Sequence, residues 1–348
     1  MPPSTESIPA EFARALRELG VAGADEPLAG QPLAGGVSSD IWRIDTAHGA
    51  VCAKRALPKL RVAADWRAPI ARNAFEARWM QVAAQAVPGS APRVLGQHEG
   101  LGVLVMEYLD PARHALWKQR LRDGEVDVPF ARAVGDTLGR IHAYAAARPE
   151  LAARFDTDAI FFDIRLEPYL LATARKHPEL AAALQALVAQ TQAHKCSLVH
   201  GDVSPKNILV GPPRVGGSSI GDHAAQPVLL DAECAWWGDP AFDLAFCLNH
   251  LLLKCLWVPA ARLPLMASFD ALARAYLQRV DWEPAQALER RAAALLPGLL
   301  LARVDGKSPV EYLTTEPQWR TVRRCAAQWR RQPVARLAEV AAAWVVAS

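Results

Sequence analysis

The chain has 348 residues, of which 39 are Lys or Arg and 36 are Asp or Glu, so its formal net charge is only +3. This length predicts about two domains and can bury a full core without disulfides or a structural metal. The near balance of charge provides no overall basic field for nucleic-acid binding.

The six cysteines form no C-x-x-C pair and no zinc-type cluster with histidine, which predicts reduced thiols in a cytoplasmic protein. The N-terminal segment has no basic stretch followed by an apolar one, so we expect no secretory signal. The longest uncharged apolar run, residues 292–302, contains Pro297 and is shorter than the roughly 20 residues of a membrane span. We therefore expect a soluble monomer or homodimer without nucleic-acid or membrane partners.

Residues 1–107 are expected to form a small lobe with a sheet and one or two helices. Val37–Ile44 and Ala50–Lys54 are strand-like and are joined by a turn-like Ala-His-Gly, which predicts a hairpin. Apolar residues at helical spacing predict a helix over 71–86, with Glu76 close to its apolar face. Residues 103–106 then predict a buried strand.

Residues 108–348 are expected to form a larger, mainly helical lobe. Amphipathic, alanine-rich segments predict helices over 130–147, 165–195, 240–256, 268–278 and 284–303. Short apolar runs predict strands at 197–199, 208–210 and 227–230. The Gly/Pro/Ser-rich connection over 211–227 is longer than a usual hairpin loop, which predicts either a functional flap or a surface insertion. The fold class is therefore α+β.

The segment His200-Gly201-Asp202-Val203-Ser204-Pro205-Lys206-Asn207 is the most informative part of the sequence. Asn207 lies just before one predicted strand, and Asp231 of the later Asp231-Ala232-Glu233 lies just after the next. If these strands pair as an antiparallel hairpin about 4.8 Å apart, an amide oxygen and a carboxylate converge, as Mg²⁺ requires. Asp202 precedes the same point and can orient a hydroxyl group.

Phosphoryl transfer needs an aligned hydroxyl, metal ligands that bridge phosphate oxygens and a lysine for the remaining charge. Lys54 ends a predicted strand and is placed to reach phosphates, and Glu76 is placed to pair with it. A small-residue stretch at the start of the predicted hairpin would let backbone N–H groups approach phosphates. This stretch consists of Gly35, Gly36, Ser38 and Ser39.

This order of motifs resembles the aminoglycoside phosphotransferase and choline kinase superfamily, relatives of the protein kinases, over roughly residues 30–250. The resemblance implies a two-lobed protein-kinase-like fold that uses ATP and Mg²⁺. It implies that Asp202 is the catalytic aspartate and that Asn207 and Asp231 are the metal ligands. It also implies that adenine binds at Met106, Glu107 and Tyr108, and that Asp243 braces the catalytic loop.

A closer resemblance is to the methylthioribose kinase branch. It rests on segments such as Pro92-Arg93-Val94, Phe242-Asp243 and Asn249-His250-Leu251-Leu252. That branch tends to have serine at the position of Asn207 and a twin arginine where this chain has Ala302-Arg303. The implied acceptor is a small-molecule hydroxyl, on a sugar-like metabolite such as methylthioribose or on an aminoglycoside-like amino alcohol. The alternatives are a nucleotide-binding pseudokinase that acts as a regulator or scaffold, and a transferase of AMP.

Two segments of the helical lobe have both structural and functional interpretations. Asp239-Pro240 predicts the N-cap and first residue of a helix. Ser308-Pro309 with Glu311 predicts a capping box after a turn between helices. Alternatively, Arg303, Asp305 and Lys307 line the acceptor pocket. Residues 250–348 contain 14 Lys or Arg and 8 Asp or Glu, which favours a neutral or anionic acceptor over a polycationic one.

Overall fold

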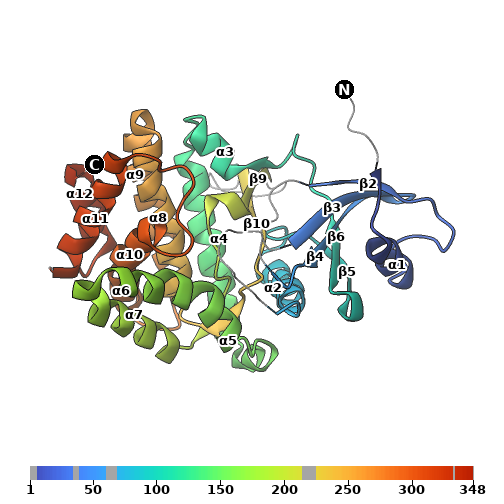
Figure 1. Ribbon diagram of the computed structural model, residues 1–348, viewed down its shortest axis with the longest axis horizontal. Helices are drawn as coiled ribbons and strands as arrows, with labels where there is room; N and C mark the ends of the chain where they lie inside the picture. The colour runs from blue at the N-terminus through green and yellow to red at the C-terminus, as the bar shows by residue number, and fades with distance from the viewer. Residues whose placement is uncertain (1–5, 34–38, 60–68, 214–224, 332–333, 348) are drawn as a thin grey trace. The chain divides into compact units, whose positions relative to one another are not determined.

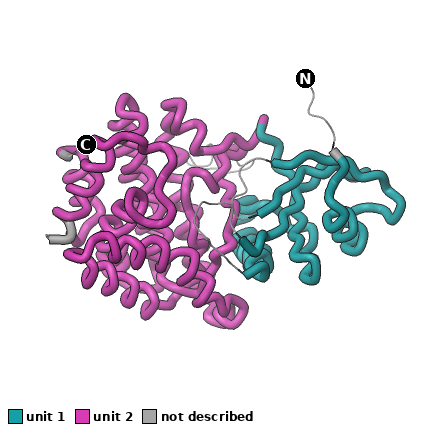
Figure 2. Tube along the Cα trace, in the orientation of Figure 1, with its two compact units in different colours: residues 1–111 teal, residues 112–348 magenta. Residues whose placement is uncertain are grey.

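The computed structural model describes residues 6–33, 39–59, 69–213, 225–331 and 334–347. The chain forms two compact units, Met1–Pro111 and Ala112–Ser348 (Figure 2). The boundary between the two lobes was predicted at residue 107. Among the described residues, no helix combines the length and the apolar character needed to cross a membrane. All six cysteines are free thiols.

The first unit contains an antiparallel sheet whose described strands have the order β1-β2-β3-β4-β6-β5 (Figure 1). These strands are β1 (Glu6–Ser7), β2 (Ala29–Pro32), β3 (Ser39–Thr46), β4 (Gly49–Ala56), β5 (Val94–His98) and β6 (Val103–Glu107). The predicted hairpin is confirmed, because β3 pairs with β4 and places Ile41 opposite Lys54. Gly49 closes the turn at φ +115°, a conformation that residues with a Cβ rarely adopt.

Helices pack against this sheet. They are α1 (Ala10–Glu18), the single-turn η1 (Glu99–Leu101) and α2 (Arg72–Ala86). Helix α1 buries Phe12 and Leu16 in a core that includes Ile44 and Val105. Helix α2 confirms the helix predicted over 71–86 and contacts β4, β5 and β6. The predicted small α+β lobe is therefore present.

The second unit is mainly helical (Figure 1). Its α-helices are α3 (Trp117–Arg122), α4 (Val128–Ala146), α5 (Asp158–Phe161), α6 (Ala172–Lys176), α7 (Ala181–Ala193), α8 (Ala241–Trp257), α9 (Arg262–Leu277), α10 (Ala285–Asp305), α11 (Glu316–Arg331) and α12 (Leu337–Ala347). Its other helical segments are η2 (Pro149–Arg154), η3 (Phe162–Leu171), η4 (Pro178–Leu180), η5 (Pro205–Asn207) and η6 (Pro259–Ala261). Helix α8 contacts α9 and α10 and is buried on all sides from Ala241 to Cys255. It is the central helix of this unit.

Short strands flank the His200–Asn207 motif in the second unit. They are β7 (Ala115–Leu116), β8 (Ser197–Val199), β9 (Ile208–Pro213), β10 (Ala225–Leu229) and β11 (Trp236–Gly238). They form one sheet in the order β10-β9-β7 and a pair of β11 with β8. The predicted strands at 197–199, 208–210 and 227–230 are confirmed, and β9 pairs with β10 in an antiparallel hairpin. Residues 214–224 of the predicted long connection lie outside the described residues.

The helix predicted over 165–195 is wrong as a continuous helix. The segment begins as the π-helical η3, continues as α6 and breaks at His177-Pro178 before α7. Pro168 lies inside η3, where it has no N–H to give to an α-helical hydrogen bond. The wider π-helical turn accommodates this missing donor, and such turns often occur at functional sites.

Two predictions about helix ends are corrected by the structure. The prediction of Asp239 as the N-cap and Pro240 as the first helical residue is wrong by one position, because Pro240 is the N-cap and α8 begins at Ala241, although Asp239 Oδ1 accepts the N–H of Ala241 at 3.0 Å. The capping box predicted at Ser308 is wrong, since the segment after α10 forms turns and the next helix begins at Glu316. The Ser308 hydroxyl instead accepts a hydrogen bond from Arg303.

Candidate active site

The motif His200–Asn207 forms a largely buried loop between β8 and β9. Both carboxylate oxygens of Asp243 hold this loop: Oδ2 accepts the N–H of His200 at 2.7 Å, and Oδ1 accepts the N–H of Gly201 at 2.8 Å. Nε2 of His142 lies 3.2 Å from Oδ2. Gly201 has φ +83°, and a Cβ there would lie 2.9 Å from the Cys234 carbonyl oxygen. Asp243 therefore braces the loop, as the sequence resemblance implied.

Asp202 lies at the centre of this loop between two cations. Its Oδ2 is 3.0 Å from Nη2 of Arg165 and 3.1 Å from Nζ of Lys206. Burial alone would raise the pKa of Asp202, but the charges of Arg165 and Lys206 outweigh it and hold the pKa below its usual value. The carboxylate is therefore ionised at neutral pH and can accept a hydrogen bond from a hydroxyl group.

Arg165 and Lys206 were not predicted as site residues. Arg165 comes from η3, donates from Nε to the carbonyl oxygen of Gly201 and is buried with Asp202. Nothing in the sequence near Arg165 marks it, because it lies in a helical stretch far from the motif. Lys206 could have been found, since it stands four residues after Asp202 within the motif itself. Together they supply two positive charges beside the carboxylate.

The predicted metal ligands lie at adjacent ends of the β9–β10 hairpin. The carbonyl oxygen of Asn207 accepts the N–H of Leu230 at 2.9 Å, which places Asp231 one residue away. The Asn207 side chain donates from Nδ2 to the carbonyl oxygen of Asp202 at 3.1 Å. This bond leaves its amide oxygen for another partner. Asp231 has φ +66°, a left-handed conformation that aspartate tolerates better than most residues. An amide and a carboxylate oxygen fit the hard ligands that Mg²⁺ prefers.

In the first unit, Lys54 and Glu76 form a buried ion pair. Nζ of Lys54 on β4 lies 2.8 Å and 3.0 Å from the two carboxylate oxygens of Glu76 on α2. Both side chains are almost fully buried. Asn73 adds a hydrogen bond from Nδ2 to the carbonyl oxygen of Lys54 at 3.2 Å. The predicted pairing is thus confirmed, and the lysine is held in one position on the sheet.

The other predicted nucleotide-binding residues lie at the ends of strands in the same unit. Met106 and Glu107 end β6, and the Glu107 carboxylate accepts the N–H of Arg93 at 2.8 Å. Tyr108 follows, with the Arg43 guanidinium 5.3 Å from its ring centre. Ser39 is buried at the start of β3. The remaining members of the small-residue stretch, Gly35, Gly36 and Ser38, lie outside the described residues.

A family model described as the phosphotransferase enzyme family matches residues 29–288. This match covers most of the chain and includes Lys54, Glu76, Asp202, Asn207 and Asp231, whereas Arg303, Asp305 and Lys307 lie beyond it. The chain belongs to the phosphotransferase enzyme family.

Curated relatives of the chain include methylthioribose kinases. The chain is 24% identical to that of Bacillus cereus strain B4264 over 247 residues, which cover 62% of this chain and 58% of the relative. It is 27% identical to that of Pectobacterium atrosepticum over 261 residues, with 67% and 61% covered. The chain therefore spans less than two thirds of the length of these relatives.

Among solved structures, an ethanolamine kinase shares the fold. A Plasmodium vivax ethanolamine kinase has a TM-score of 0.53 at 12% identity, with 97% of this chain and 86% of that chain covered. A spectinomycin phosphotransferase in complex with ADP and spectinomycin has a TM-score of 0.49 at 10% identity, with 99% of both chains covered. The described residues combine an antiparallel sheet in the first unit with a mainly helical second unit, as predicted.

The three residues predicted to line an acceptor pocket lie in different surroundings. Arg303 is buried and donates from Nη1 to the hydroxyl groups of Tyr169 and Ser308, both at 3.0 Å. Asp305 is paired with Arg323 at 2.8 Å and with His177 at 2.8 Å. Lys307 is half-exposed and pairs with Glu167 at 2.8 Å. Since Asp305 and Lys307 are occupied by ion pairs, Arg303 is the member of this set with unused hydrogen-bonding capacity.

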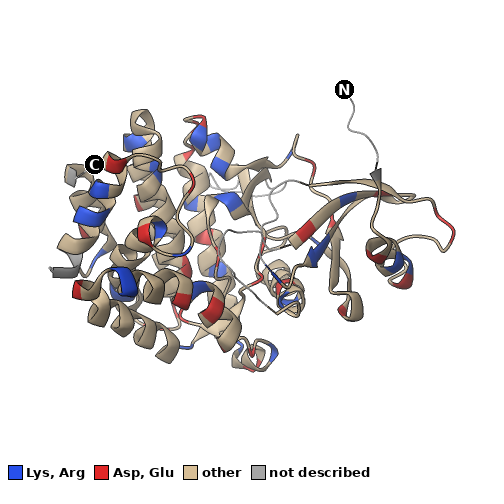
Figure 3. Ribbon diagram, viewed as in Figure 1, with Lys and Arg blue, Asp and Glu red and all other residues tan. Residues whose placement is uncertain are grey.

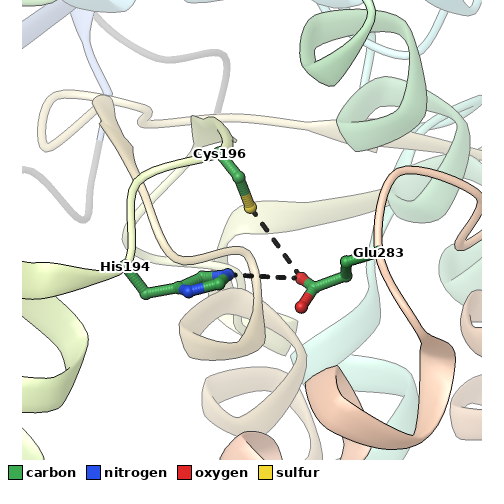
Figure 4. Close-up of side chains that lie close together, drawn as sticks. All are labelled: His194, Cys196 and Glu283. Carbon is green, nitrogen blue, oxygen red and sulfur yellow. Dashed lines mark hydrogen bonds and ion pairs between the residues drawn. The ribbon is translucent and has the colours of Figure 1, made fainter.

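A second group of titratable side chains lies beside the C-terminal end of α7. His194, Cys196 and Glu283 approach one another within 4.8 Å (Figure 4). Both carboxylate oxygens of Glu283 already accept from Arg291, at 2.7 and 2.8 Å. Sulfur and imidazole ligands do not suit Mg²⁺. This group is therefore not the predicted magnesium site, and the Arg291 charge beside it opposes the binding of any cation.

Proposed function

We propose that the protein is an ATP- and Mg²⁺-dependent kinase that transfers the γ-phosphate to a hydroxyl group of a small molecule. The observation that supports this most strongly is the buried loop in which Asp202, Asn207 and the residue before Asp231 are joined by hydrogen bonds. In the reaction, the acceptor oxygen forms a bond to the γ-phosphorus while the bond from that phosphorus to the β-phosphate oxygen breaks. ADP leaves, and the hydroxyl proton passes to Asp202 or to solvent.

Asp202 acts mainly by orienting the acceptor. Because Arg165 and Lys206 keep its pKa low, its carboxylate is a weak base but a constant hydrogen-bond acceptor. This suits a loose transition state, in which the hydroxyl proton is lost late and positioning contributes most of the rate. Lys206 beside it places a positive charge near the carboxylate.

Asn207 and Asp231 would hold Mg²⁺, which when bound neutralises developing charge on the phosphate oxygens. Lys54 would bind phosphate oxygens of the nucleotide, with its position fixed by Glu76. Residues Met106 to Tyr108 would bind the adenine. We assign the nucleotide to these residues of the first unit and the acceptor to the second unit.

The acceptor is proposed to be a sugar-like or other hydroxylated metabolite. The relatives named as methylthioribose kinases support a sugar-like acceptor. The excess of Lys and Arg over residues 250–348 disfavours a polycationic antibiotic. Figure 3 shows Lys and Arg positions interspersed with Asp and Glu positions along the ribbon of the helical unit.

The experiment that tests the proposal is ADP release from ATP and Mg²⁺ by the purified protein. The acceptors are methylthioribose, other pentoses, choline, homoserine and several aminoglycosides, with Asp202→Asn as the matched control. Acceptor-dependent ADP that is lost in the variant supports a small-molecule kinase. Pyrophosphate in place of ADP would indicate AMP transfer. Nucleotide binding with no release for any acceptor would favour a pseudokinase.

A further inference from the structure

Lys254 on α8 is a buried lysine without a counter-charge. Its side chain is 1% exposed. Its ammonium lies 4.5 Å from the ring centre of Trp257 and 4.3 Å from that of Tyr312, and these two rings stack at 4.6 Å. Among the described residues, no carboxylate lies within ion-pair distance of Lys254. The nearby Glu311 is paired with Lys118.

Arg303 on α10 is a second buried cation with neutral partners. It is 7% exposed, and its hydrogen bonds go to the oxygens of Tyr169 and Ser308. Its Nε is buried and has no hydrogen-bond partner. A buried charge in a protein is normally paired with an opposite charge, because removing it from water costs several kcal/mol. Among the described residues, neither Lys254 nor Arg303 has a carboxylate within ion-pair distance, and Glu311, whose charge acts on both, is paired with Lys118.

His250 completes this cluster. It is 4% exposed, its Nδ1 lies 3.2 Å from the Tyr312 hydroxyl, and its Nε2 is buried without a hydrogen-bond partner. Burial lowers the pKa of His250 well below its usual value, and the charges of Arg303 and Lys254 lower it further. The imidazole is therefore neutral, and its unpartnered nitrogen is available to a ligand. We call Lys254, Arg303 and His250 the basic cluster.

The basic cluster lies one layer of side chains from Asp202. The Tyr169 ring is 5.4 Å from the Arg303 guanidinium and 5.8 Å from that of Arg165, which binds Asp202. Phe246 makes a second bridge, 5.4 Å from the His250 ring and 5.8 Å from the Arg165 guanidinium. Tyr169 and Phe246 thus connect the cluster to the surroundings of Asp202 through direct side-chain contacts.

We infer that the acceptor carries an oxyanion, a carboxylate or a phosphate ester, and that the basic cluster binds it. This inference rests on the proposed kinase function and specifies its substrate class. The oxyanion supplies the missing counter-charge for Lys254 and Arg303 and a partner for His250. The stacked Trp257 and Tyr312 rings hold the lysine in place and exclude water, which strengthens the pairing. A neutral acceptor would leave both cations unpaired.

The pKa of Lys254 should change when an oxyanion binds to the basic cluster. Burial, together with the charges of Lys118 and Arg303, lowers the pKa of Lys254 to about 7, and Glu311 opposes this shift. A bound oxyanion favours the ammonium form, so it must raise this pKa. The first measurement follows the ¹⁵N resonances of labelled lysine side chains in the full chain, with MgADP present to fill the nucleotide site. Comparison with Lys254→Met assigns the Lys254 signal.

The probes are glycerate and glycerol 3-phosphate, with glycerol as the neutral match. We expect at least one oxyanion to raise the titration midpoint of Lys254 by one pH unit or more, and glycerol to leave it unchanged. A response to glycerate alone identifies a carboxylate, and a response to glycerol 3-phosphate alone identifies a phosphate ester. The control Lys195→Met, which alters a surface lysine paired with Asp158, should keep the response. If neither oxyanion shifts the midpoint, the inference is wrong.

A second measurement separates this inference from the proposed function. ADP release is followed with the same three compounds and with the neutral pentoses. We expect turnover of an anionic acceptor, and a rise of its KM of about tenfold or more in Lys254→Met with the KM for ATP unchanged within twofold. Asp202-dependent turnover of neutral acceptors only would leave the kinase function intact and overturn the oxyanion site. A shifted Lys254 midpoint without ADP release from any acceptor would support the site and contradict the kinase function.

Discussion

Nη2 of Arg165 lies 3.0 Å from Oδ2 of Asp202, and both side chains are buried. The same guanidinium donates to the carbonyl oxygen of Gly201, so it contacts both the backbone of the loop and the carboxylate of Asp202. Arg165 belongs to the π-helical segment η3, which aims it at the loop. Its position therefore links the irregular turn of the helix around Pro168 to the geometry of the candidate catalytic aspartate.

Arg165 is expected to be a positioning residue whose removal changes both rate and pH dependence. In Arg165→Met, the carboxylate of Asp202 loses a charge that lowers its pKa, so its pKa rises. In the native protein this carboxylate contributes stability above its unfolded pKa, and the contribution is lost as pH falls through the lower folded value. The acid limb of kcat should therefore move to higher pH in the variant, and kcat should fall on the order of 10²-fold.

The pH dependence of kcat in the Arg165 variants shows whether Arg165 positions Asp202 or only stabilises the fold. Arg165→Lys keeps the positive charge but cannot make the two hydrogen bonds of a guanidinium. Its acid limb of kcat should therefore lie between that of the native protein and that of Arg165→Met. If Arg165→Met lowers only the thermal midpoint and leaves the pH profile of kcat in place, Arg165 is structural.

The buried pair of Lys54 and Glu76 makes a second prediction. Removing one partner leaves the other charge without its main counter-ion in the interior, which costs about 3–5 kcal/mol. Lys54→Met and Glu76→Gln should both lower the free energy of unfolding, and the double variant should lose less than the sum. Calorimetric titration with ATP should show weaker binding wherever Lys54 is absent. Full ATP affinity in Lys54→Met would contradict its role in nucleotide binding.

The features that could be predicted from the sequence are those set by residues close together in the chain. The His200 to Asn207 motif is a contiguous loop, and the β9–β10 hairpin follows from two apolar runs, so the convergence of Asn207 and Asp231 could be foreseen. The Lys54 pairing with Glu76 also followed from a strand and the next helix. In each case a short-range pattern set the geometry.

Contacts between distant segments could not be predicted. Arg165 has the ordinary pattern of a helix surface, and only the π-helical turn at Pro168 directs it to the loop. Lys254 likewise occupies a position in α8 where a lysine normally faces water, but α8 is covered on all sides by other helices. Whether a charged side chain is buried depends on tertiary packing, which helical periodicity does not report.

The packing of α4 against α9 makes a third prediction. A Cβ on Gly135 would lie 2.2 Å from the carbonyl oxygen of Leu272, a backbone atom that cannot move alone. Gly135→Ala should therefore lower the free energy of unfolding by about 1–3 kcal/mol or more, despite the better helix propensity of alanine. At Gly139 the closest atom is the Cβ of Arg279, 2.8 Å away, so the overlap is smaller than at Gly135 although this atom is also held by the backbone. Gly139→Ala should cost less. Denaturant unfolding of both variants measures the difference, and equal losses would contradict it.

The last prediction concerns the hydrogen bonds from the loop around Asp202 to the Asp243 carboxylate. Its two oxygens accept the N–H groups of His200 and Gly201, and an asparagine would offer one oxygen and turn an NH₂ group toward the other N–H. Because a hydrogen bond to a charged group contributes about 1.5–3 kcal/mol, Asp243→Asn should destabilise the protein by about 2 kcal/mol or more. The loop that presents Asp202 should also loosen, so kcat should fall while nucleotide affinity stays near its native value. Asp281→Asn in the loop before α10 is the matched control. Hydrogen exchange at the amides of His200 and Gly201 should accelerate in Asp243→Asn alone, and unchanged protection there would show that the brace lies elsewhere.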